Sequence, residues 1–386
     1  MRRDAAPTPG ERIGERIIAG AMSGTSADGV DVALVCVGGR GTSMTARLLH
    51  HHHRTYGPVL KQLIFSLRAA ESATLSDLAR CTREVSLAYA EAVNAAIAGA
   101  GMTAEELSAV AAHGQTAYHA PPDTIQLLDP SLVAARTGCA VVSDFRRADC
   151  AAGGQGAPLV PFADYIFFRH PERNRAVVNI GGIANMTCLY AGGTTGDIRA
   201  FDTGPGNCIS DHLMRTHDPA GPGIDVGGRL ASMGRASGPV FEVLLKHPYF
   251  EKVGPKSTDG PEMIRIFVDA VRTHDPRLPL EDQLATAAAL TAWLIHLSLY
   301  NFGSEFDGEM ILSGGGVRNE AVMRHLRRYV RRLLTTDELG VPSEAKEAIA
   351  FALLGAATLD GLPSNVPSAT GASRAVVLGS ITPKPD

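Results

Sequence analysis

Short apolar runs recur along the chain, and most of them end in a polar turn that is rich in glycine. Runs of Ile, Val, Ala and Leu over 15–22 and 30–37 predict two buried strands, joined by a hairpin turn at 23–29. Further strands are predicted, in chain order, over 109–112, 139–143, 176–181, 187–190, 198–201 and 309–313. Because ligands bind at the carboxyl ends of strands in open α/β sheets, we expect the polar turns to converge on one cleft.

Helical periodicity occupies much of the chain between these strands. Apolar residues at steps of three or four predict a helix over about 74–100, which Gly99 and Gly101 would end. Other helices are predicted over 130–137, 281–302 and 346–359, and after Cys208 and Asn319. The alternation of strands and helices predicts an α/β protein.

The strand–turn–strand pattern near residue 17 recurs near residue 176, which predicts two related α/β domains with a cleft between them. Proline and charged residues collect over 159–173, where we place the seam. We therefore expect a disordered lead at 1–14, a first domain at 15–165 that the segment 345–386 joins, and a second domain at 166–344.

Composition excludes several classes of function. The net charge of −4 over 386 residues offers no basic surface for nucleic acid. No window approaches the roughly 18 apolar residues of a membrane span, and the polar N-terminus lacks the apolar core of a signal peptide. The six cysteines include no C-x-x-C pair, so we expect buried, reduced thiols in a cytoplasmic protein. The run His50 to His53 alternates between the faces of a strand and cannot bind one metal together.

The turn in MSGTSADGVDVALV (22–35) has the composition of an anion-binding loop without the lysine of a P-loop. Its backbone N–H groups could bind a phosphate, and we expect Gly24 and Gly29 to supply the unusual φ that such a turn needs. Asp28 and Asp31 would repel a phosphate unless Mg²⁺ lies between, reached through water. The alternative is a surface turn whose Asp bonds its own backbone.

Three later motifs have similar chemistry. GGIANMT (181–187) predicts a second phosphate hairpin, and GGGVRN (314–319) would let a nucleoside approach the backbone, with Asn319 as helix cap, ligand contact or both. FDTGPGN places Asp202 at a strand end before a rigid turn. From the residues alone, Asp202 and Asp144 are equal candidates for a general base.

Eight segments together resemble one family. They are MSGTSADGVDVALV, AAHGQT, VVSDFRRADCAAGGQGAPLVP, AVVNIGGIANMT, FDTGPGN, GPKST, LSGGGVRN and KEAIAFALL, in family order from residue 20 to about 355. The chain resembles the 1,6-anhydro-N-acetylmuramic acid kinases, of the superfamily of sugar kinases, actin and heat-shock ATPases. The resemblance implies an actin-like, ribonuclease H-like ATPase fold. It also implies a reaction in which ATP, water and the anhydro-sugar give N-acetylmuramic acid 6-phosphate and ADP, with Mg²⁺ as cofactor.

The resemblance also assigns residues. Asp202 becomes the catalytic base, Asp28 a ligand of Mg²⁺ through water, and Lys256 a residue that steadies a domain edge or closes over the cleft. The sugar would be bound by His113, Gln115, Asp144, Arg146 and Glu347. ATP would be bound by Ser23, Gly24, Thr25, Ser26, Ala27, Asp28, Gly29, Val30, Asp31, Gly181, Gly182, Asn185, Gly204, Gly206, Asn207, Gly314, Gly315, Gly316 and Asn319. Family members commonly form homodimers, so this chain could form one too.

Three positions depart from the family pattern. Ala148 stands where the family has an arginine that suits the substrate's carboxylate, and Arg147 is its neighbour. Leu128 replaces a glycine, and the usual Gly-Arg-Glu after Thr258 is absent. The departures leave the identity of the sugar substrate open, with 1,6-anhydroglucose as the nearest competitor.

Two alternative functions remain, a non-catalytic ATP-binding sugar sensor and another transferase such as a carboxylate kinase. The intact Asp202 and glycine hairpins argue against the sensor, and FDTGPGN and AAGGQGAPLVP against the other transferase.

Overall fold

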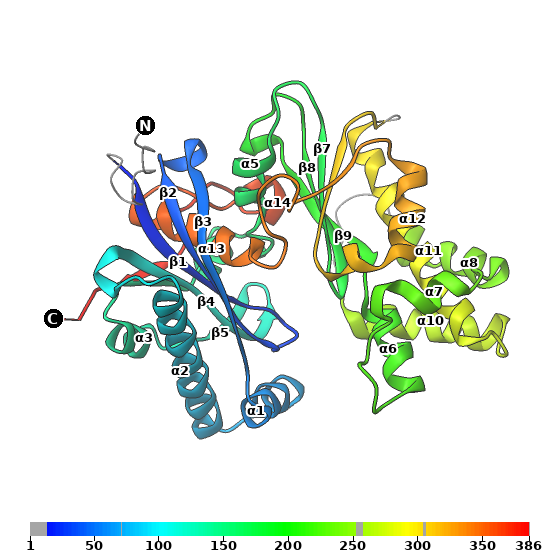
Figure 1. The fold of residues 1–386 in the computed structure, drawn as a ribbon, viewed down its shortest axis with the longest axis horizontal. Helices are drawn as coiled ribbons and strands as arrows, with labels where there is room; N and C mark the ends of the chain where they lie inside the picture. Colours follow the sequence, from blue (N-terminus) through cyan, green and yellow to red (C-terminus); the bar gives the residue numbers. More distant parts are fainter. Residues whose placement is uncertain (1–13, 71, 252–257, 304–305, 386) are drawn as a thin grey trace, which may run out of the picture. The chain divides into compact units, whose positions relative to one another are not determined.

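The computed structural model describes residues 14–70, 72–251, 258–303 and 306–385. These fall into two compact units (Figure 1). The first unit comprises the chain up to Phe167 together with the segment from Glu344 onward, and the second comprises Phe168–Ser343. The predicted lead at 1–14 lies almost wholly outside the described residues, as does Lys256.

The described part of the first unit contains a mixed seven-stranded sheet. Strands β1, β2 and β3 form an antiparallel meander, β4 and β6 continue the sheet in parallel beyond β1, β5 pairs with β4, and β12 pairs with β6. Their bounds are β1 Arg16–Ser23, β2 Gly29–Gly38, β3 Thr45–Thr55, β4 Leu107–Ala120, β5 Asp123–Leu127, β6 Val141–Ser143 and β12 Ser380–Thr382.

The second unit repeats this order. Its five described strands run β11-β10-β7-β8-β9, with an antiparallel β7-β8-β9 meander and with β10 and β11 parallel to β7. They are β7 Arg175–Ile180, β8 Ile183–Leu189, β9 Arg199–Pro205, β10 Glu309–Ser313 and β11 Leu333–Thr335. The prediction of two related α/β units is confirmed, because β6-β4-β1-β2-β3 and β11-β10-β7-β8-β9 have the same connectivity and strand directions.

Helices complete both units. Those assigned to the first unit are α1 Pro58–Ala69, α2 Leu75–Gly99, α3 Pro130–Thr137, α4 Arg147–Ala151, α5 Pro161–Phe168, α13 Lys346–Leu359 and α14 Pro367–Thr370. The second has α6 Cys208–His217, α7 Arg229–Met233, α8 Gly238–Leu245, α9 Pro248–Glu251, α10 Gly260–His274, α11 Leu280–Ser298 and α12 Glu320–Tyr329. No helix of the described residues is long and apolar enough to cross a membrane.

Helix α13 packs on the first sheet at very short range. A Cβ atom on Gly20 of β1 would lie 1.9 Å from the carbonyl oxygen of Ala348, and one on Gly355 would lie 2.5 Å from the Cβ of Ala111. Neither position has room for a side chain, so glycine at both sets how closely the helix approaches the sheet. Helix α13, although it follows the second unit in the chain, is thereby part of the core of the first unit.

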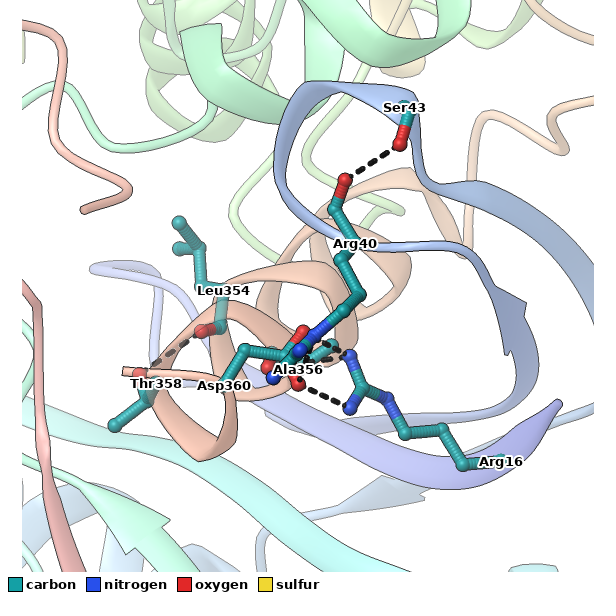
Figure 2. A network of polar contacts seen from close by, with 7 residues as sticks. All are labelled: Arg16, Arg40, Ser43, Leu354, Ala356, Thr358 and Asp360. Carbon is teal, nitrogen blue, oxygen red and sulfur yellow. Dashed lines mark hydrogen bonds and ion pairs between the residues drawn. The ribbon is translucent and has the colours of Figure 1, made fainter. Parts of the chain in front are cut away.

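An ion-pair network fixes the far end of the same helix (Figure 2). The Arg16 guanidinium donates to both carboxylate oxygens of Asp360, at 2.7 and 2.6 Å, and more weakly to the carbonyl of Ala356 at 3.3 Å. Arg40 adds a contact of 3.2 Å to the same carboxylate. Because the Asp360 side chain is only 4% exposed, this buried ion pair ties the first strand of the unit to the C-terminal end of α13.

Two strands are longer than predicted. HGQT (113–116) lies inside β4 and not after it, because β4 continues as a hairpin with β5. Asp202 likewise lies within β9 and pairs with Asn185 of β8, so the strand continues through DTGP. All six cysteines are free and buried, as predicted. The mostly polar strand β3 has no apolar alternation, and the sequence pattern did not predict it.

Candidate active site

The turn at 23–29 is a tight hairpin whose geometry differs from the prediction in one respect. Neither Gly24 nor Gly29 has a positive φ; the left-handed residue is Ala27, at φ 49°, which is fully buried. Its N–H donates to the Gly24 carbonyl at 3.1 Å. Gly29 is required for a different reason, because a Cβ there would lie 2.2 Å from the carbonyl oxygen of Arg54 on β3.

The carboxylates of Asp28 in this turn and of Asp31 in β2 have partners that the sequence did not predict. Asp28 accepts a hydrogen bond from Lys61 of α1 at 2.5 Å, and Arg68 of the same helix donates to the Thr25 carbonyl. Burial acts to raise the pKa of Asp28, but the hydrogen bonds and charges of its neighbours, Lys61 foremost, lower it overall. Positive charge therefore reaches the turn from α1 and not from a residue of the turn.

Asp31 lies on a face of the sheet with two of the four histidines. His51 and His53 of β3, two residues apart, both contact its Oδ1, at 3.1 and 2.9 Å. Burial opposes the effect, but these two contacts lower the pKa of Asp31. In the part of the chain that the structure describes, no group of three or more His, Cys, Asp or Glu side chains could hold a metal ion.

Gln115 connects the HGQT segment to the hairpin. Its Oε1 accepts from the Ser23 hydroxyl at 2.7 Å, and its Nε2 donates to the Gly24 carbonyl at 3.0 Å. Both side chains are essentially buried. The structure thus brings a residue expected to bind sugar against one expected to bind phosphate, and Gln115 also positions the turn.

His113 and Arg146 form a buried polar pair. The Arg146 Nε donates to His113 Nε2 at 3.0 Å, and its Nη1 donates to the Gly156 carbonyl at 2.7 Å. Burial, reinforced by the Arg146 charge, holds the pKa of His113 well below its usual range, so the imidazole is neutral. Burial also lowers the pKa of Arg146 to about 10, which leaves it cationic near pH 7. The ring of Phe351 lies 4.9 Å from that of His113.

Two further predicted sugar residues lie in the same unit as this pair. Asp144 follows β6 with a left-handed φ of 62°, a strained conformation for a non-glycine residue. Glu347 lies in the first turn of α13. Burial raises the pKa of Glu347. The charge of Asp31 also raises it, and the charges of Lys346 and Arg146 lower it.

Asp149, which sequence reasoning did not select, organises the loop beside Arg146. It is fully buried and accepts hydrogen bonds at 2.8 Å from the Gly156 N–H, from Asn365 and from Thr370. A Cβ on Gly154 would lie 2.2 Å from its Oδ2, so the loop folds tightly around this carboxylate. The signal available in the sequence was the second Asp of DFRRAD, within a run of glycines.

The glycine motifs of the second unit meet at one end of its sheet. The N–H groups of Gly206 and Asn207 donate to the carbonyls of Gly182 and Gly181, at 2.9 and 2.8 Å. A Cβ on Gly316 would lie 2.2 Å from the side chain of Ile180. Asn319 caps α12, because its side-chain oxygen accepts hydrogen bonds from the Ala321 and Val322 N–H groups. The predicted cap is therefore confirmed, and the contact of Asn319 with a ligand stays a prediction.

Asp202 projects from β9 in a largely enclosed position. Its Oδ2 accepts one hydrogen bond, from the Thr258 N–H at 3.0 Å. Burial raises the pKa of Asp202 to about 6, and this single bond only partly offsets the rise. A second carboxylate, Asp211 on α6, also has its pKa raised to about 6 by burial, and the sequence gave no indication of it.

Comparison with known proteins gives matches over nearly the whole chain. A family model described as anhydro-N-acetylmuramic acid kinase matches residues 16–384. A protein of that name from Caldanaerobacter subterraneus subsp. tengcongensis is 37% identical, covering 95% of this chain and 97% of its own. Another from Salinibacter ruber is 38% identical over 96% of this chain and 97% of its own. Among solved structures, component A of (R)-2-hydroxyglutaryl-CoA dehydratase from Acidaminococcus fermentans is similar with a TM-score of 0.43 and 13% identity, covering 89% of this chain and 99% of that one.

Removal of the Asp149 carboxylate should destabilise the first unit. Asp149→Ala removes the acceptor of three hydrogen bonds, from Gly156, Asn365 and Thr370, and we expect the free energy of unfolding to fall by about 2–4 kcal/mol. Urea unfolding of the full chain measures this. Asp123→Ala, an exposed carboxylate on β5, is the control and should change it by less than about 0.5 kcal/mol. Equal effects of the two substitutions would contradict the role given to Asp149.

Proposed function

Because the chain belongs to the anhydro-N-acetylmuramic acid kinase family, we propose that it opens the 1,6-anhydro ring of 1,6-anhydro-N-acetylmuramic acid and phosphorylates O6 with ATP. The products are N-acetylmuramic acid 6-phosphate and ADP. The observation that carries the assignment of the base is the enclosed carboxylate of Asp202, with one hydrogen-bond donor and a raised pKa. Among the described residues, its Oδ1 has no hydrogen-bond donor.

Ring opening needs a base at the attacking water. Asp202 would accept a proton from that water as its oxygen attacks C1 and the C1–O6 bond breaks. The freed O6 then attacks the γ-phosphorus of ATP. A pKa near 6 suits this task, since the carboxylate is ionised at neutral pH yet more basic than an ordinary Asp. General base catalysis of this kind contributes about 10²–10⁴-fold to the rate.

Phosphoryl transfer depends mainly on positioning and on charge neutralisation. Each unit has glycine-rich turns that would offer backbone N–H groups to the nucleotide, at 23–29 in the first unit and at 181–182 and 314–316 in the second. Lys61 lies beside the turn of the first unit. Mg²⁺ would neutralise charge on the phosphates when bound. Asp28, with 61% of its side chain exposed, fits the single carboxylate that a water-coordinated Mg²⁺ commonly uses.

The sugar would be recognised by the polar groups of the first unit. Its hydroxyls would donate to Asp144 and Glu347. Arg146 would donate to them from the guanidinium N–H groups that its bonds to His113 and to the Gly156 carbonyl leave over. His113, whose two ring nitrogens already pair with the Gly114 carbonyl and with Arg146, would line the site and hold Arg146 in place. Because ATP is the second substrate, we place the protein in the cytoplasm. The homodimer stays a prediction from the family.

Replacement of the base should stop turnover without preventing nucleotide binding. In Asp202→Asn the shape is retained and the proton acceptor is lost, so we expect kcat to fall by at least about 10²-fold. Calorimetric titration should show ATP binding within about threefold of the wild type. If kcat persists, Asp202 is not the base.

The pH profile should report the same carboxylate. Because the base must be ionised, kcat/KM should be flat above about pH 7 and fall tenfold per unit below the pKa of about 6. Asp211 has a similar pKa, so Asp211→Asn is the matched control and should leave the acidic limb in place. Loss of that limb in the Asp211 variant would move the assignment to Asp211.

A further inference from the structure

The segment Asp-Gly-Pro-Glu (259–262), which follows Thr258 in place of the usual Gly-Arg-Glu, forms the start of α10. Asp259 is the N-cap residue, and its Oδ1 accepts a hydrogen bond from the Glu262 N–H at 2.9 Å. Pro261 lies in the first turn, where its fixed φ suits a helix and its missing N–H costs nothing. These residues therefore define the helix start directly after Thr258.

Helix α10 has a fixed place in the second unit. Met263, Ile266 and Phe267 lie on one face of the helix and are buried in the core of that unit. The helix also contacts β9, the strand that contains Asp202. The first turn of α10 is therefore held at a set distance from this strand.

Thr258 connects the carboxylate of Asp202 to the helix start through two hydrogen bonds. Its backbone N–H donates to Asp202 Oδ2 at 3.0 Å, and its hydroxyl donates to Glu262 Oε2, also at 3.0 Å. An N–H donor favours the ionised form of a carboxylate. The bond from Thr258 accordingly lowers the pKa of Asp202, against the larger effect of burial, which raises it to about 6.

The other polar neighbours of this carboxylate bring it no positive charge. They are Asn185 of β8, Thr291 of α11, Tyr249 of α9, and Asp259 and Glu262 of α10. Burial raises the pKa of Tyr249, and the charge of Asp202 raises it further, so the phenol is neutral at pH 7. Among the described residues, the Thr258 N–H is thus the one donor to Asp202.

We propose that Thr258 is a positioning residue for the general base, because its hydroxyl, anchored on Glu262, keeps its backbone N–H on Asp202. The inference rests on the proposed function, in which Asp202 is that base. The proton affinity of the base then depends on a side-chain contact one residue before α10.

The first test removes the hydroxyl and retains the shape of the side chain. In Thr258→Val the N–H is no longer held on Asp202, so the carboxylate loses a donor. The acidic limb of kcat/KM should move to higher pH by about 0.5–1 unit, which lowers kcat/KM about three- to tenfold at pH 5. At pH 8 kcat/KM should stay within about twofold of the wild type. A purely structural defect would lower the rate equally at both pH values and would contradict the proposal.

Variants of the anchor separate the hydrogen bond from the charge. Glu262→Ala should move the limb upward as Thr258→Val does, whereas loss of a negative charge alone would move it downward. The double variant should move it no further than either single variant, because both remove the same bond. Glu262→Gln retains an acceptor and should stay near the wild type. Asp269→Ala, on the same helix with a side chain 45% exposed, is the control and should leave the limb in place.

A second measurement needs no turnover. Carbon-13 NMR of the full chain with labelled aspartate carboxyl groups gives the pKa of Asp202 from the signal that is missing in Asp202→Asn. An upward shift of this pKa in Thr258→Val and in Glu262→Ala supports the inference, whether or not the protein turns over the sugar. An unchanged pKa in both variants overturns it. Absence of turnover by the wild type bears on the proposed function alone.

Discussion

The close packing of α13 across β1 and β4 is the constraint on which the first unit depends. Gly20 and Gly355 remove the side chains that would hold the helix away from the sheet, and Arg16 with Asp360 fixes its far end. This packing brings Phe351 against His113 and places Glu347 where the charge of Arg146 acts on it. Residues more than two hundred positions apart in the chain thereby share one polar cluster.

Glycines serve a similar purpose in the second unit. Gly206, Gly314 and Gly316 each stand where a Cβ would overlap the backbone or side chains around Ile180 and Gly181. The three motifs therefore meet by close backbone approach, and the positions of their N–H groups follow from this packing. The repeated strand order explains why a glycine hairpin recurs between the first two strands of each unit.

Much of this arrangement could be predicted from the sequence. Apolar runs located most of the buried strands, and helices α3 and α13 were predicted with the bounds that the structure shows. Strand ends were less predictable, because HGQT and DTGP are polar yet continue β4 and β9 through pairing with a neighbouring strand. The motifs identified the family, and the matching family model confirmed it.

Long-range partners could not be predicted. The histidines of β3 reach Asp31 only because β3 pairs with β2, and Lys61 reaches Asp28 only because α1 lies beside the first hairpin. Asp149 shows its role only when Asn365 and Thr370 return to it. The unusual φ of the hairpin was predicted at glycines, but it falls on Ala27, and Gly29 is needed instead for space against Arg54.

The central claim is that this chain couples the opening of an anhydro-sugar to the use of ATP. The most direct test follows ADP and phosphorylated sugar together, with and without 1,6-anhydro-N-acetylmuramic acid. We predict that ADP forms only when the sugar is present, with one N-acetylmuramic acid 6-phosphate for each ADP. ADP formation at the same rate without the sugar, or none with any anhydro-sugar, would contradict the account.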